Sequence, residues 1–594
     1  MDKRLFQLLL ALWLLAAPFA FAARDVEKLL REEGARAKAN AGLYYDEIFD
    51  RDGQLRPQYK DIYPRLLEKE PSELKKIRAL TKKDFLGDNA LSPVALITEK
   101  SEHDLKRQGV AQRGRALLEF LKDHYSGKKT YSEVMHPALV DRIIARTGET
   151  SYAGHINPES IRFMYGPDII RDADGVFRVL EDNTNFLGGQ GDLVKARESL
   201  WKRLPEYATA LDKEEIAQPM DFYKSLLTRY RREMPDPKAP VVFFSVPPYP
   251  DNEDVRLNKI WKELGVETVT PFTRNPKLVK KKDGLYLERK VGAKVRAEKI
   301  GYLILNTEFG GLDPGFAPSH HQFLFEAAKE HLGAKGREAI SRKNREALEK
   351  ALVPDPSGNI DYAEVENVLR KKLGLSHFTE GTERGLVEAI VKGQVLSNNT
   401  PGIDFINDKE FNIYVEDLIR HYLKEEPILR NLPARRLYAV NKAGERVVDE
   451  KVFRDLERDT GKYVVKVVDG RGGEGVWVGP RLSAEGRAAM LQKLQEDTGR
   501  EVIVQEYRHP SVLAGDIVDE RVLAQVGPRE IGGKFVEVSE TGWSRGVSMA
   551  GDGKVNLSAG KAHEVTVLQR RLDVKTGLPV RPRSCSELYR EALY

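Results

Sequence analysis

A glycine-rich loop between two short β-branched segments constrains the local fold more strongly than any other pattern in this chain. The first segment, residues 463–468, carries a single lysine, Lys466, among its valines. Glycine allows a backbone to fold closely over an anion and to turn its N–H groups toward it. A lysine on the adjoining strand can bind the same phosphates as a point charge. We therefore expect a strand–loop–strand clamp for nucleotide phosphates, formed by Lys466 with Gly470, Arg471, Gly472, Gly473 and Gly475.

The loop alone leaves a second interpretation open. It is neither a Walker A motif nor a dinucleotide-binding fingerprint, because no Gly-Lys-Ser/Thr and no helical pattern follows the glycines. A glycine-rich hairpin with one solvated lysine fits the same residues, since short motifs often occur by chance.

The chain is too long for one hydrophobic core. Its 594 residues predict several domains, and 41% apolar with 31% charged residues is typical of a globular protein. The 96 basic and 91 acidic side chains give a net charge of +5, which provides no global argument for nucleic-acid or membrane binding. Cys585 is the only cysteine, so stability must come from packing rather than from an intramolecular disulfide.

The first 22 residues have the composition of a secretory signal peptide. Lys3 and Arg4 precede an apolar run over residues 5–17, and Ala20 and Ala22 match the small-x-small cleavage pattern. We expect cleavage after Ala22 and export to the periplasm or the cell exterior, with no stable membrane span afterwards. The alternative is an uncleaved leader that anchors the chain in the inner membrane.

Segments with helical periodicity and segments with strand periodicity alternate along the rest of the chain. Residues 23–149 have helical spacing of apolar positions, and strands are expected at 163–165 and 176–180 around a turn at 172–175. A strand at 241–245, a helix at 254–264 and a strand at 266–269 predict a parallel α/β unit. A further strand is expected at 302–306, and the pattern is rich in strands after residue 462.

Oxygen donors at the end of one hairpin suggest a metal site. Glu181 and Asn183 are two residues apart, so they point to the same face of a strand, and Asp168 lies across the hairpin. Mg²⁺ prefers such hard oxygen ligands together with nucleotide phosphates. An exposed polar hairpin end is the alternative for these residues.

Several charged residues in the last third can complete a phosphoryl-transfer site. Glu506 ends a predicted strand and can accept hydrogen bonds from adenine or ribose. Asp519 and Arg521 share one face of another strand, and Arg545 lies in a loop-like Gly-Trp-Ser-Arg-Gly context. An arginine near a transferring phosphoryl group stabilises the charge of the transition state, whereas a surface ion pair is the commoner role of any single arginine.

Three blocks together resemble the circularly permuted ATP-grasp family, which includes glutathionylspermidine synthetase. They are residues 166–184 with the Asp…Glu-x-Asn pattern, residues 241–269 with 396–402, and residues 463–479 with Glu506, Arg545 and 556–561. The resemblance covers roughly residues 150–570, and the order of the blocks is more specific than any one motif.

The resemblance implies a fold and a set of roles. It implies an α+β and α/β multidomain protein: a circularly permuted ATP-grasp core, an α/β pre-grasp unit, a β-rich nucleotide lid and added helical segments. After the signal peptide, the implied division begins with a helical region, residues 23–149, and the metal-binding half of the core, residues 150–235. The pre-grasp unit follows at residues 236–460, with a helical insertion at about 315–380. Residues 461–594 form the nucleotide lid and the rest of the core. The resemblance implies that Mg²⁺ would be bound by Asp168, Glu181, Asn183 and Asn556. It implies that ATP would be bound by Lys466, Glu506 and Lys561. Catalysis would depend on Arg545 and Arg521.

Three features depart from the family pattern, and one of them is Val467, which stands where many relatives have proline. Thr307-Glu308 stands where members of the family often have paired arginines, which leaves the acceptor site undefined. The insertion contains residues 355–364, which match most of a calcium-binding EF-hand loop, but Val353 occupies the first ligand position. We expect a helix–turn–helix here rather than a functional calcium site.

Two functions are compatible with these observations. The first is an exported ATP-dependent carboxylate–amine ligase that forms an acylphosphate and takes a small-molecule or peptide substrate, with an amine or thiol acceptor and no nucleic acid. The second is a catalytically inactive ATP-grasp-like protein that binds a peptide or cell-envelope ligand, which a signal peptide favours because ATP is scarce outside the cytoplasm. The complete set Asp168, Glu181, Asn183, Lys466 and Arg545 favours the enzyme.

Overall fold

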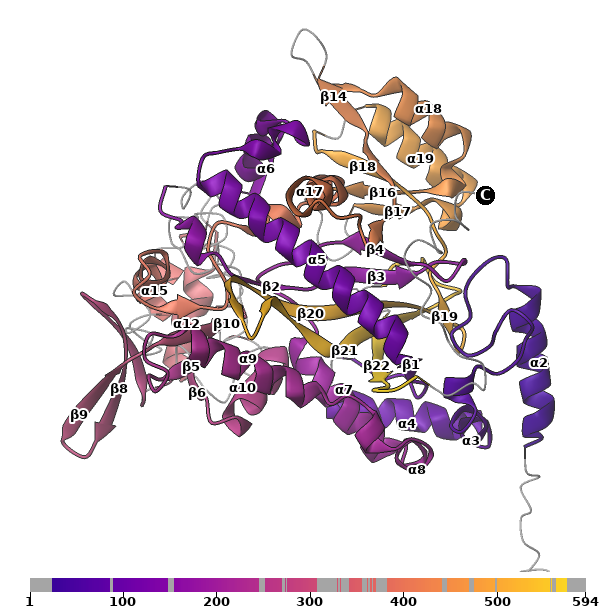
Figure 1. Ribbon diagram of the computed structural model, residues 1–594, viewed down its shortest axis with the longest axis horizontal. Helices are drawn as coiled ribbons and strands as arrows, with labels where there is room; N and C mark the ends of the chain where they lie inside the picture. Colours follow the sequence, from indigo (N-terminus) through magenta and orange to yellow (C-terminus); the bar gives the residue numbers. More distant parts are fainter. Residues whose placement is uncertain are drawn as a thin grey trace, which may run out of the picture.

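A computed structural model gives the fold of the chain (Figure 1). It describes residues 24–85, 89–147, 154–244, 252–269, 273, 275–306, 328, 332, 341–354, 360–361, 364–365, 367–369, 382–440, 446–468, 475–496, 499–555, 557 and 562–573. The predicted leader and most of the EF-hand-like loop lie outside these residues. None of the described helices is long and apolar enough to cross a membrane.

A large mixed sheet forms the centre of the molecule (Figure 1). Its main path is β1-β22-β21-β20-β3-β4-β12, and β2 and β19 also pair with β20. The strands are β1 Leu96–Thr98, β2 Phe163–Tyr165, β3 Asp168–Arg171, β4 Phe177–Glu181, β12 Arg430–Asn431, β19 Val512–Leu513, β20 Asp516–Ile531, β21 Lys534–Ser548 and β22 His563–Gln569. The predicted hairpin is confirmed, because β3 and β4 pair antiparallel.

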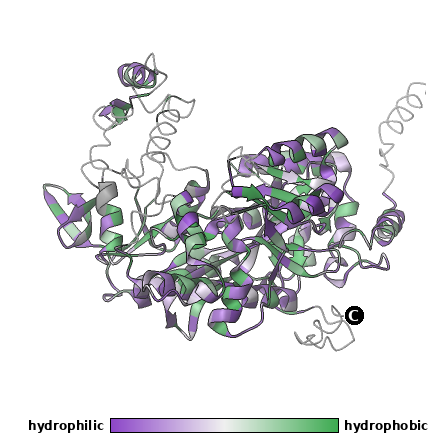
Figure 2. Ribbon diagram, turned by 90° about the horizontal axis from the view of Figure 1, so that it is seen from above, coloured by the Kyte–Doolittle hydropathy of each residue, from purple (hydrophilic) through white to green (hydrophobic). Residues whose placement is uncertain are grey.

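Helices cover both faces of this sheet. Helix α5 (Lys100–Tyr125) begins with a capping box between Glu99 and Glu102, which satisfies two backbone donors, and buries one face against the sheet. Side chains alternate along β20, so Val522 packs with the α5 side while Leu523 packs with α7 (Gln190–Arg203) and α9 (Pro219–Glu233). Hydrophilic and hydrophobic residues alternate along the helices, as expected for elements with one buried face (Figure 2).

The predicted parallel α/β unit is present as a four-stranded sheet of order β11-β10-β5-β6. Strand β5 (Val241–Phe244), helix α10 (Asn252–Glu263) and strand β6 (Glu267–Val269) form its βαβ unit. Strand β10 (Tyr302–Leu305) pairs parallel with β5 on the other side and with β11 (Leu396–Ser397). All four strands are parallel, which agrees with the continuous apolar runs in the sequence.

A smaller antiparallel sheet contains the two strands predicted on either side of the glycine-rich loop, whose residues 469–474 lie outside the described part of the chain. Its order is β13-β18-β16-β17, with β13 Ala434–Arg436, β16 Tyr463–Val467, β17 Val476–Val478 and β18 Val502–Glu506. Val465 and Val504 pack against helices α18 (Glu450–Arg458) and α19 (Ala484–Gln495) on one face. Because side chains alternate, Lys466 points from the opposite face.

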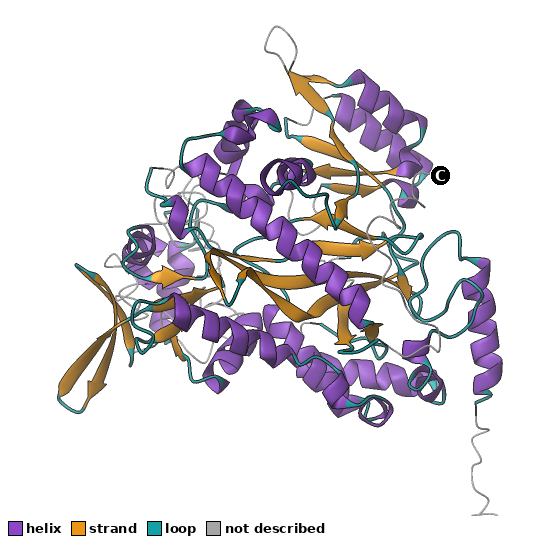
Figure 3. Cartoon of the chain, in the orientation of Figure 1, coloured by secondary structure: helices purple, strands orange, loops and turns teal. Residues whose placement is uncertain are grey.

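The remaining elements surround these sheets (Figure 3). A three-stranded meander extends away from the body, and a short hairpin lies beside the small sheet (Figures 1 and 3). These strands are β7 Lys277–Lys281, β8 Gly284–Val291, β9 Lys294–Lys299, β14 Tyr438–Val440 and β15 Arg446–Val448. The other α-helices of the described residues are α2 Val26–Ala39, α3 Tyr63–Leu67, α4 Pro71–Asp84, α6 Pro137–Thr147, α8 Glu206–Ala210, α12 Arg342–Ala351, α15 Thr382–Val391, α16 Lys409–Asn412 and α17 Val415–Leu418, and α17 continues into a π-helical turn, Ile419–Leu423.

One local prediction is wrong. The Gly-Trp-Ser-Arg-Gly segment around Arg545 is not a loop but the middle of β21. Its glycines serve close packing instead of a turn: a Cβ at Gly542 would lie 2.2 Å from Oε1 of Glu520, and one at Gly546 would lie 2.7 Å from Nε2 of His563.

Candidate active site

Asp168 lies at the start of β3, where two arginines from strands distant in sequence, β20 and β21, bind its carboxylate. Nε of Arg521 donates to Oδ1 at 2.7 Å, and Nη2 of Arg545 donates to Oδ2 at 2.9 Å. Only 4% of Asp168 is exposed. Burial alone would raise its pKa, but the two guanidinium charges outweigh burial and hold the pKa of Asp168 well below its usual range. The carboxylate is therefore ionised and its two oxygens are occupied.

Arg545 is shared between two acidic groups. Asp519 lies opposite it in the β20–β21 ladder and accepts a hydrogen bond from Nε of Arg545 at 3.2 Å. The pKa of Asp519 is raised to about 6, mainly because the carboxyl group is buried. The positive charge of Arg545 lowers this pKa, and the negative charge of Asp168 raises it. The Trp543 ring lies beneath both guanidiniums, 5.3 Å from Cζ of Arg521 and 4.9 Å from Cζ of Arg545, so cation–π contacts fix their planes.

Among the described residues, Glu181 and Asn183 have oxygens that no hydrogen bond occupies and that could bind a metal ion. Glu181 is the register partner of Asp168, and its carboxylate approaches Nζ of Lys409 only to 4.0 Å. The amide nitrogen of Asn183 donates to the Gly166 carbonyl at 3.3 Å, which leaves Oδ1 as the remaining polar atom. Mg²⁺ commonly takes one or two protein oxygens and completes its shell with water and phosphate oxygens. This donor pair fits such an ion, whereas Asp168 is already held by arginines.

Within the described ranges, no larger acidic cluster surrounds this pair. Across the described part of the chain, no group of three or more His, Cys, Asp or Glu side chains is arranged to hold a metal ion. A cation bound by Glu181 and Asn183 would therefore depend on phosphate oxygens for the rest of its ligands.

Lys466 is buried in the small sheet and has no carboxylate partner within the part of the chain that the structure describes. It is 9% exposed, and no described residue forms an ion pair or hydrogen bond with its ammonium group. Burial lowers the pKa of Lys466, and Glu181 and Asp168 partly offset this by their negative charge. The lysine thus faces the metal-donor pair across the junction of the two sheets. A buried, unpaired cation needs an anionic ligand to compensate its desolvation.

Two further cations near this junction were not predicted from the sequence. Arg436 of β13 and Lys466 of β16 both lie opposite Ile503 of β18, so the two cations share one face of the small sheet. Lys409 of α16 approaches Glu181 and lowers the pKa of Lys466. The alternation of β13 could have indicated Arg436, but nothing in the sequence near Lys409 points to this site.

Other predicted site residues are placed differently or lie outside the described residues. Glu506 ends β18 and pairs with Arg508 at 2.7 Å, and it alternates to the face opposite Lys466. Gly475 adopts a left-handed backbone with φ of 64°, which a glycine tolerates without strain. Gly470, Arg471, Gly472, Gly473, Asn556 and Lys561 lie outside the described part of the chain.

A buried network behind β4 holds the metal-donor pair in place. Asp182 points away from Glu181 and Asn183 and accepts two hydrogen bonds from Arg113 of α5, at 3.0 and 2.6 Å. Tyr165 of β2 and Asn412 of α16 donate to the same carboxylate at 2.5 and 2.6 Å. Both members of the Arg113–Asp182 pair are fully buried. The end of β4 is therefore tied to three other elements.

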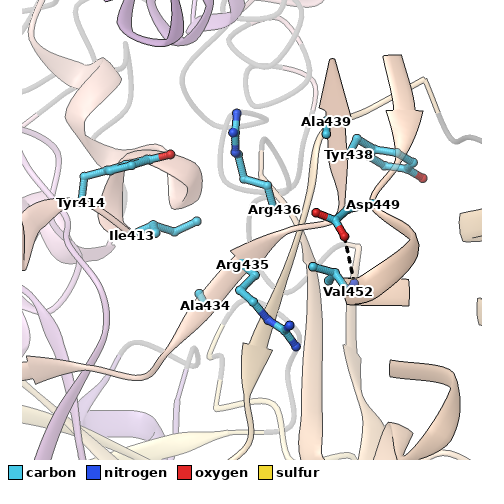
Figure 4. Close-up of a pocket in the computed structure, with 9 residues that line it drawn as sticks. All are labelled: Ile413, Tyr414, Ala434, Arg435, Arg436, Tyr438, Ala439, Asp449 and Val452. Carbon is cyan, nitrogen blue, oxygen red and sulfur yellow. Dashed lines mark hydrogen bonds between the residues drawn. The ribbon is translucent and has the colours of Figure 1, made fainter. Parts of the chain in front are cut away.

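A cavity of about 290 Å³ lies at the edge of the small sheet, beside β13 (Figure 4). Arg436 and Tyr414 are among its lining residues, and the Tyr414 hydroxyl is directed toward the side of Arg436. Arg436 contacts the buried Glu410 at 3.5 Å, while Glu410 also pairs with Arg146 at 3.0 Å. The cavity therefore adjoins the cationic face of the sheet.

Comparison with known proteins gives distant relatives over most of the chain. An uncharacterized protein of Synechocystis sp. is 24% identical over 503 residues, covering 81% of this chain and 87% of that protein. An uncharacterized protein of Mycobacterium tuberculosis is 23% identical over 473 residues, covering 77% and 71%. The chain also matches a Frankia alni protein named "Putative glutamate--cysteine ligase 2-3", at 24% identity over 551 residues. This match covers 89% of the chain but only 54% of the Frankia protein.

A solved structure and a sequence profile were also matched. The structure is a glutathione synthetase-like effector from Globodera pallida, with a TM-score of 0.46 and 9% identity over 84% of this chain and 98% of the effector. That similarity is too low to establish a shared function. The sequence profile described as circularly permuted ATP-grasp type 2 matches residues 95–253 and 370–524. Since these residues make up more than half of the chain, the protein belongs to the circularly permuted ATP-grasp type 2 family.

Proposed function

We propose that the protein is an ATP-dependent ligase that joins a carboxylate to an amine or thiol through an acylphosphate. Membership of the ATP-grasp family supports an ATP-dependent ligase as the broad class. The observation that carries the proposal is Lys466, a buried cation with no ion-pair partner among the described residues, facing Glu181 and the arginines at Asp168. A nucleotide triphosphate supplies the negative charge that this arrangement lacks.

Each residue has a defined part in this chemistry. Lys466 and Arg436 bind phosphate oxygens from the small sheet, and Glu181 and Asn183 would hold Mg²⁺ from the large one. Bound Mg²⁺ neutralises phosphate charge and orients the phosphates. Arg545 and Arg521, fixed on Trp543, stabilise the negative charge of the phosphoryl group during transfer.

The reaction needs no nucleophile from the protein. A carboxylate oxygen of the substrate attacks the γ-phosphorus, the bond to the β,γ-bridging oxygen breaks, and ADP leaves. The amine or thiol then attacks the acyl carbon, phosphate leaves with the bonding electrons, and the acceptor loses its proton. Catalysis is positioning and electrostatic stabilisation, which this rigid arginine cluster provides. Export of the protein stays a prediction from residues 1–22.

The test compares two lysine variants. Lys466→Ala removes the buried cation, and Lys462→Ala removes an exposed lysine at the start of the same segment as the matched control. We expect calorimetry to detect Mg-ATP binding in wild type and Lys462→Ala, and a loss of about tenfold to a hundredfold in Lys466→Ala, because a charge-assisted contact contributes about 1.5–3 kcal/mol.

Turnover is tested separately. ADP formation is measured with pooled amino acids, short peptides and polyamines, and hydroxylamine is added to trap an acylphosphate as its hydroxamate. Nucleotide binding without ADP formation or hydroxamate in any pool would favour a non-catalytic role. Absence of Mg-ATP binding by the folded protein would refute the proposal.

A further inference from the structure

A basic arm projects from the molecule far from the candidate active site. It consists of β7, β8 and β9, which form an antiparallel meander over residues 277–299 (Figures 1 and 3). Its base is anchored in the core by Leu278, Leu285 and Leu287, which are 3% exposed or less. The arm lies outside the residues matched by the family profile, 95–253 and 370–524. The ATP-grasp chemistry therefore does not account for it.

The arm carries the net positive charge of the whole chain. Residues 277–299 contain nine basic side chains, Lys277, Lys280, Lys281, Lys282, Arg289, Lys290, Lys294, Arg296 and Lys299, and three acidic ones, Asp283, Glu288 and Glu298. Nine minus three gives +6, compared with +5 for all 594 residues. The rest of the chain is therefore slightly acidic, and the overall balance conceals one strongly basic element.

Most of this charge is not neutralised within the fold. Salt bridges join Lys281 to Glu288 at 2.9 Å and Lys299 to Asp283 at 3.2 Å. Arg296 pairs with Glu298, and Arg289 pairs with Glu267 at the base. Five lysines have no carboxylate within 4.0 Å among the described residues: Lys277, Lys280, Lys282, Lys290 and Lys294. Lys280 is half-buried and donates to the Lys281 carbonyl at 2.6 Å. The other four lysines are exposed, so the arm presents their ammonium groups for an external anion.

The tip of the arm is apolar. Strands β8 and β9 are joined through Gly292, whose φ of 61° suits a tight two-residue turn. Val291 is 68% exposed and Val295 is 62% exposed, among the most exposed large apolar side chains of the described residues. Val291 lies opposite Lys294 and Val295 opposite Lys290 in the ladder, so each face of the tip has one valine beside one lysine.

We propose that this arm docks the protein onto an anionic phospholipid surface, with the lysines on the headgroups and the two valines in the interface. Lysines near such a surface are attracted by its negative potential. Exposed apolar side chains next to them gain by entering the boundary between headgroups and acyl chains. A lysine stem also reaches along apolar surface while its ammonium stays at the headgroups. A nucleic acid would satisfy the charges but would leave the valines in water or against polar backbone.

The test is co-sedimentation of the full chain with lipid vesicles at fixed salt. Vesicles of phosphatidylcholine alone are compared with vesicles containing about 30% phosphatidylglycerol, whose charge supplies the attraction. The arm variant is Lys290→Gln with Lys294→Gln. Its matched control is Lys38→Gln with Lys60→Gln, two exposed lysines elsewhere, so that any contribution of residues 1–22 is common to all samples. A third variant is Val291→Ser with Val295→Ser.

We expect binding to the anionic vesicles only, and a loss of about twenty-fivefold in the partition coefficient of the Lys290/Lys294 variant, since each lysine near the surface contributes about fivefold. The valine variant should bind several-fold more weakly, and the control should bind as wild type. Circular dichroism verifies that each variant is folded. Equal binding of arm and control variants would refute the proposal. Binding of a DNA duplex in preference to the vesicles, lost in the lysine variant, would also refute it.

Discussion

At the scale of single residues, the candidate site depends on where each charge is buried. Lys466 has no counter-charge in contact among the described residues, whereas Asp168 has two guanidiniums. The lysine is therefore prepared for a ligand and the aspartate for holding arginines in place. Removal of the Lys466 ammonium group should weaken ligand binding, whereas removal of the Asp168 carboxylate should lower the stability of the fold.

The pKa of Lys466 makes nucleotide binding depend on pH. Burial lowers this pKa in the free protein, and bound phosphates raise it again, so the lysine gains a proton on binding whenever the pH lies between the two values. We expect net proton uptake at alkaline pH, detected by calorimetry in two buffers of different ionisation enthalpy. Lys466→Met should abolish the uptake. Proton release by wild type would contradict this interpretation.

Loss of the charge at Asp168 should destabilise the fold. Asp168→Asn leaves Arg521 without its only carboxylate partner among the described residues and Arg545 with Asp519 alone. We expect the free energy of unfolding to fall by about 3 kcal/mol or more in urea titration, because an uncompensated buried charge remains. Asp174→Asn, an exposed position in the adjacent turn, should change it by less than about 0.5 kcal/mol. Similar values for the two variants would show that the arginines find other partners.

At the scale of elements, the end of β4 places the proposed metal donors and their anchoring carboxylate on opposite sides. The negative charge of Glu181 acts on Lys466, while Asp182 is bound by Arg113, Tyr165 and Asn412. Alternation along one strand thus separates the metal donors from the groups that fix them. The donors need this support because β4 ends there and its pairing with β12 covers only two residues.

A double-mutant cycle tests the anchor. Arg113→Met and Asp182→Leu should each lower the free energy of unfolding by about 3–5 kcal/mol, since each leaves a buried charge unpaired. The double variant should be less destabilised than the sum of the two changes, with a coupling of at least about 1 kcal/mol. Urea titration gives all four values. Additive losses would mean that the pair is not the unit that holds β4.

At the scale of the whole molecule, the proposed nucleotide contacts both sheets. The small sheet supplies Lys466 and the large one supplies Glu181, and they are in contact through Gln505, whose amide donates to the Leu180 carbonyl at 3.3 Å. A ligand that binds the folded state at this junction stabilises it by mass action. Binding should therefore be visible as increased resistance to unfolding.

We expect Mg-ATP at about a hundred times its Kd to raise the free energy of unfolding by about 2.7 kcal/mol. Thermal unfolding at several nucleotide concentrations measures this effect as a concentration-dependent Tm. Lys466→Ala should show little change at the same concentrations. An unchanged Tm for wild type would place nucleotide binding elsewhere or exclude it.

The sequence by itself determined the local elements and the faces of their side chains. Three predictions are confirmed: the paired strands on either side of the glycine-rich loop, the hairpin that carries Asp168 and Glu181, and the parallel α/β unit. These features depend on residues within a few positions of one another, where periodicity of two and turn glycines are decisive. The same reasoning was wrong at Arg545, because its flanking glycines are required by packing against Glu520 and His563 rather than by a turn.

The tertiary structure decided which charges meet. Arg521 and Arg545 reach Asp168 across 353 and 377 residues of sequence, and no local pattern records such contacts. Lys409 joins Glu181 only because α16 packs beside the end of β4. The position of the basic meander at the edge of the molecule was equally undetermined by the net charge of +5. Electrostatic interactions act through space, so a chain specifies them only after its sheets and helices are packed.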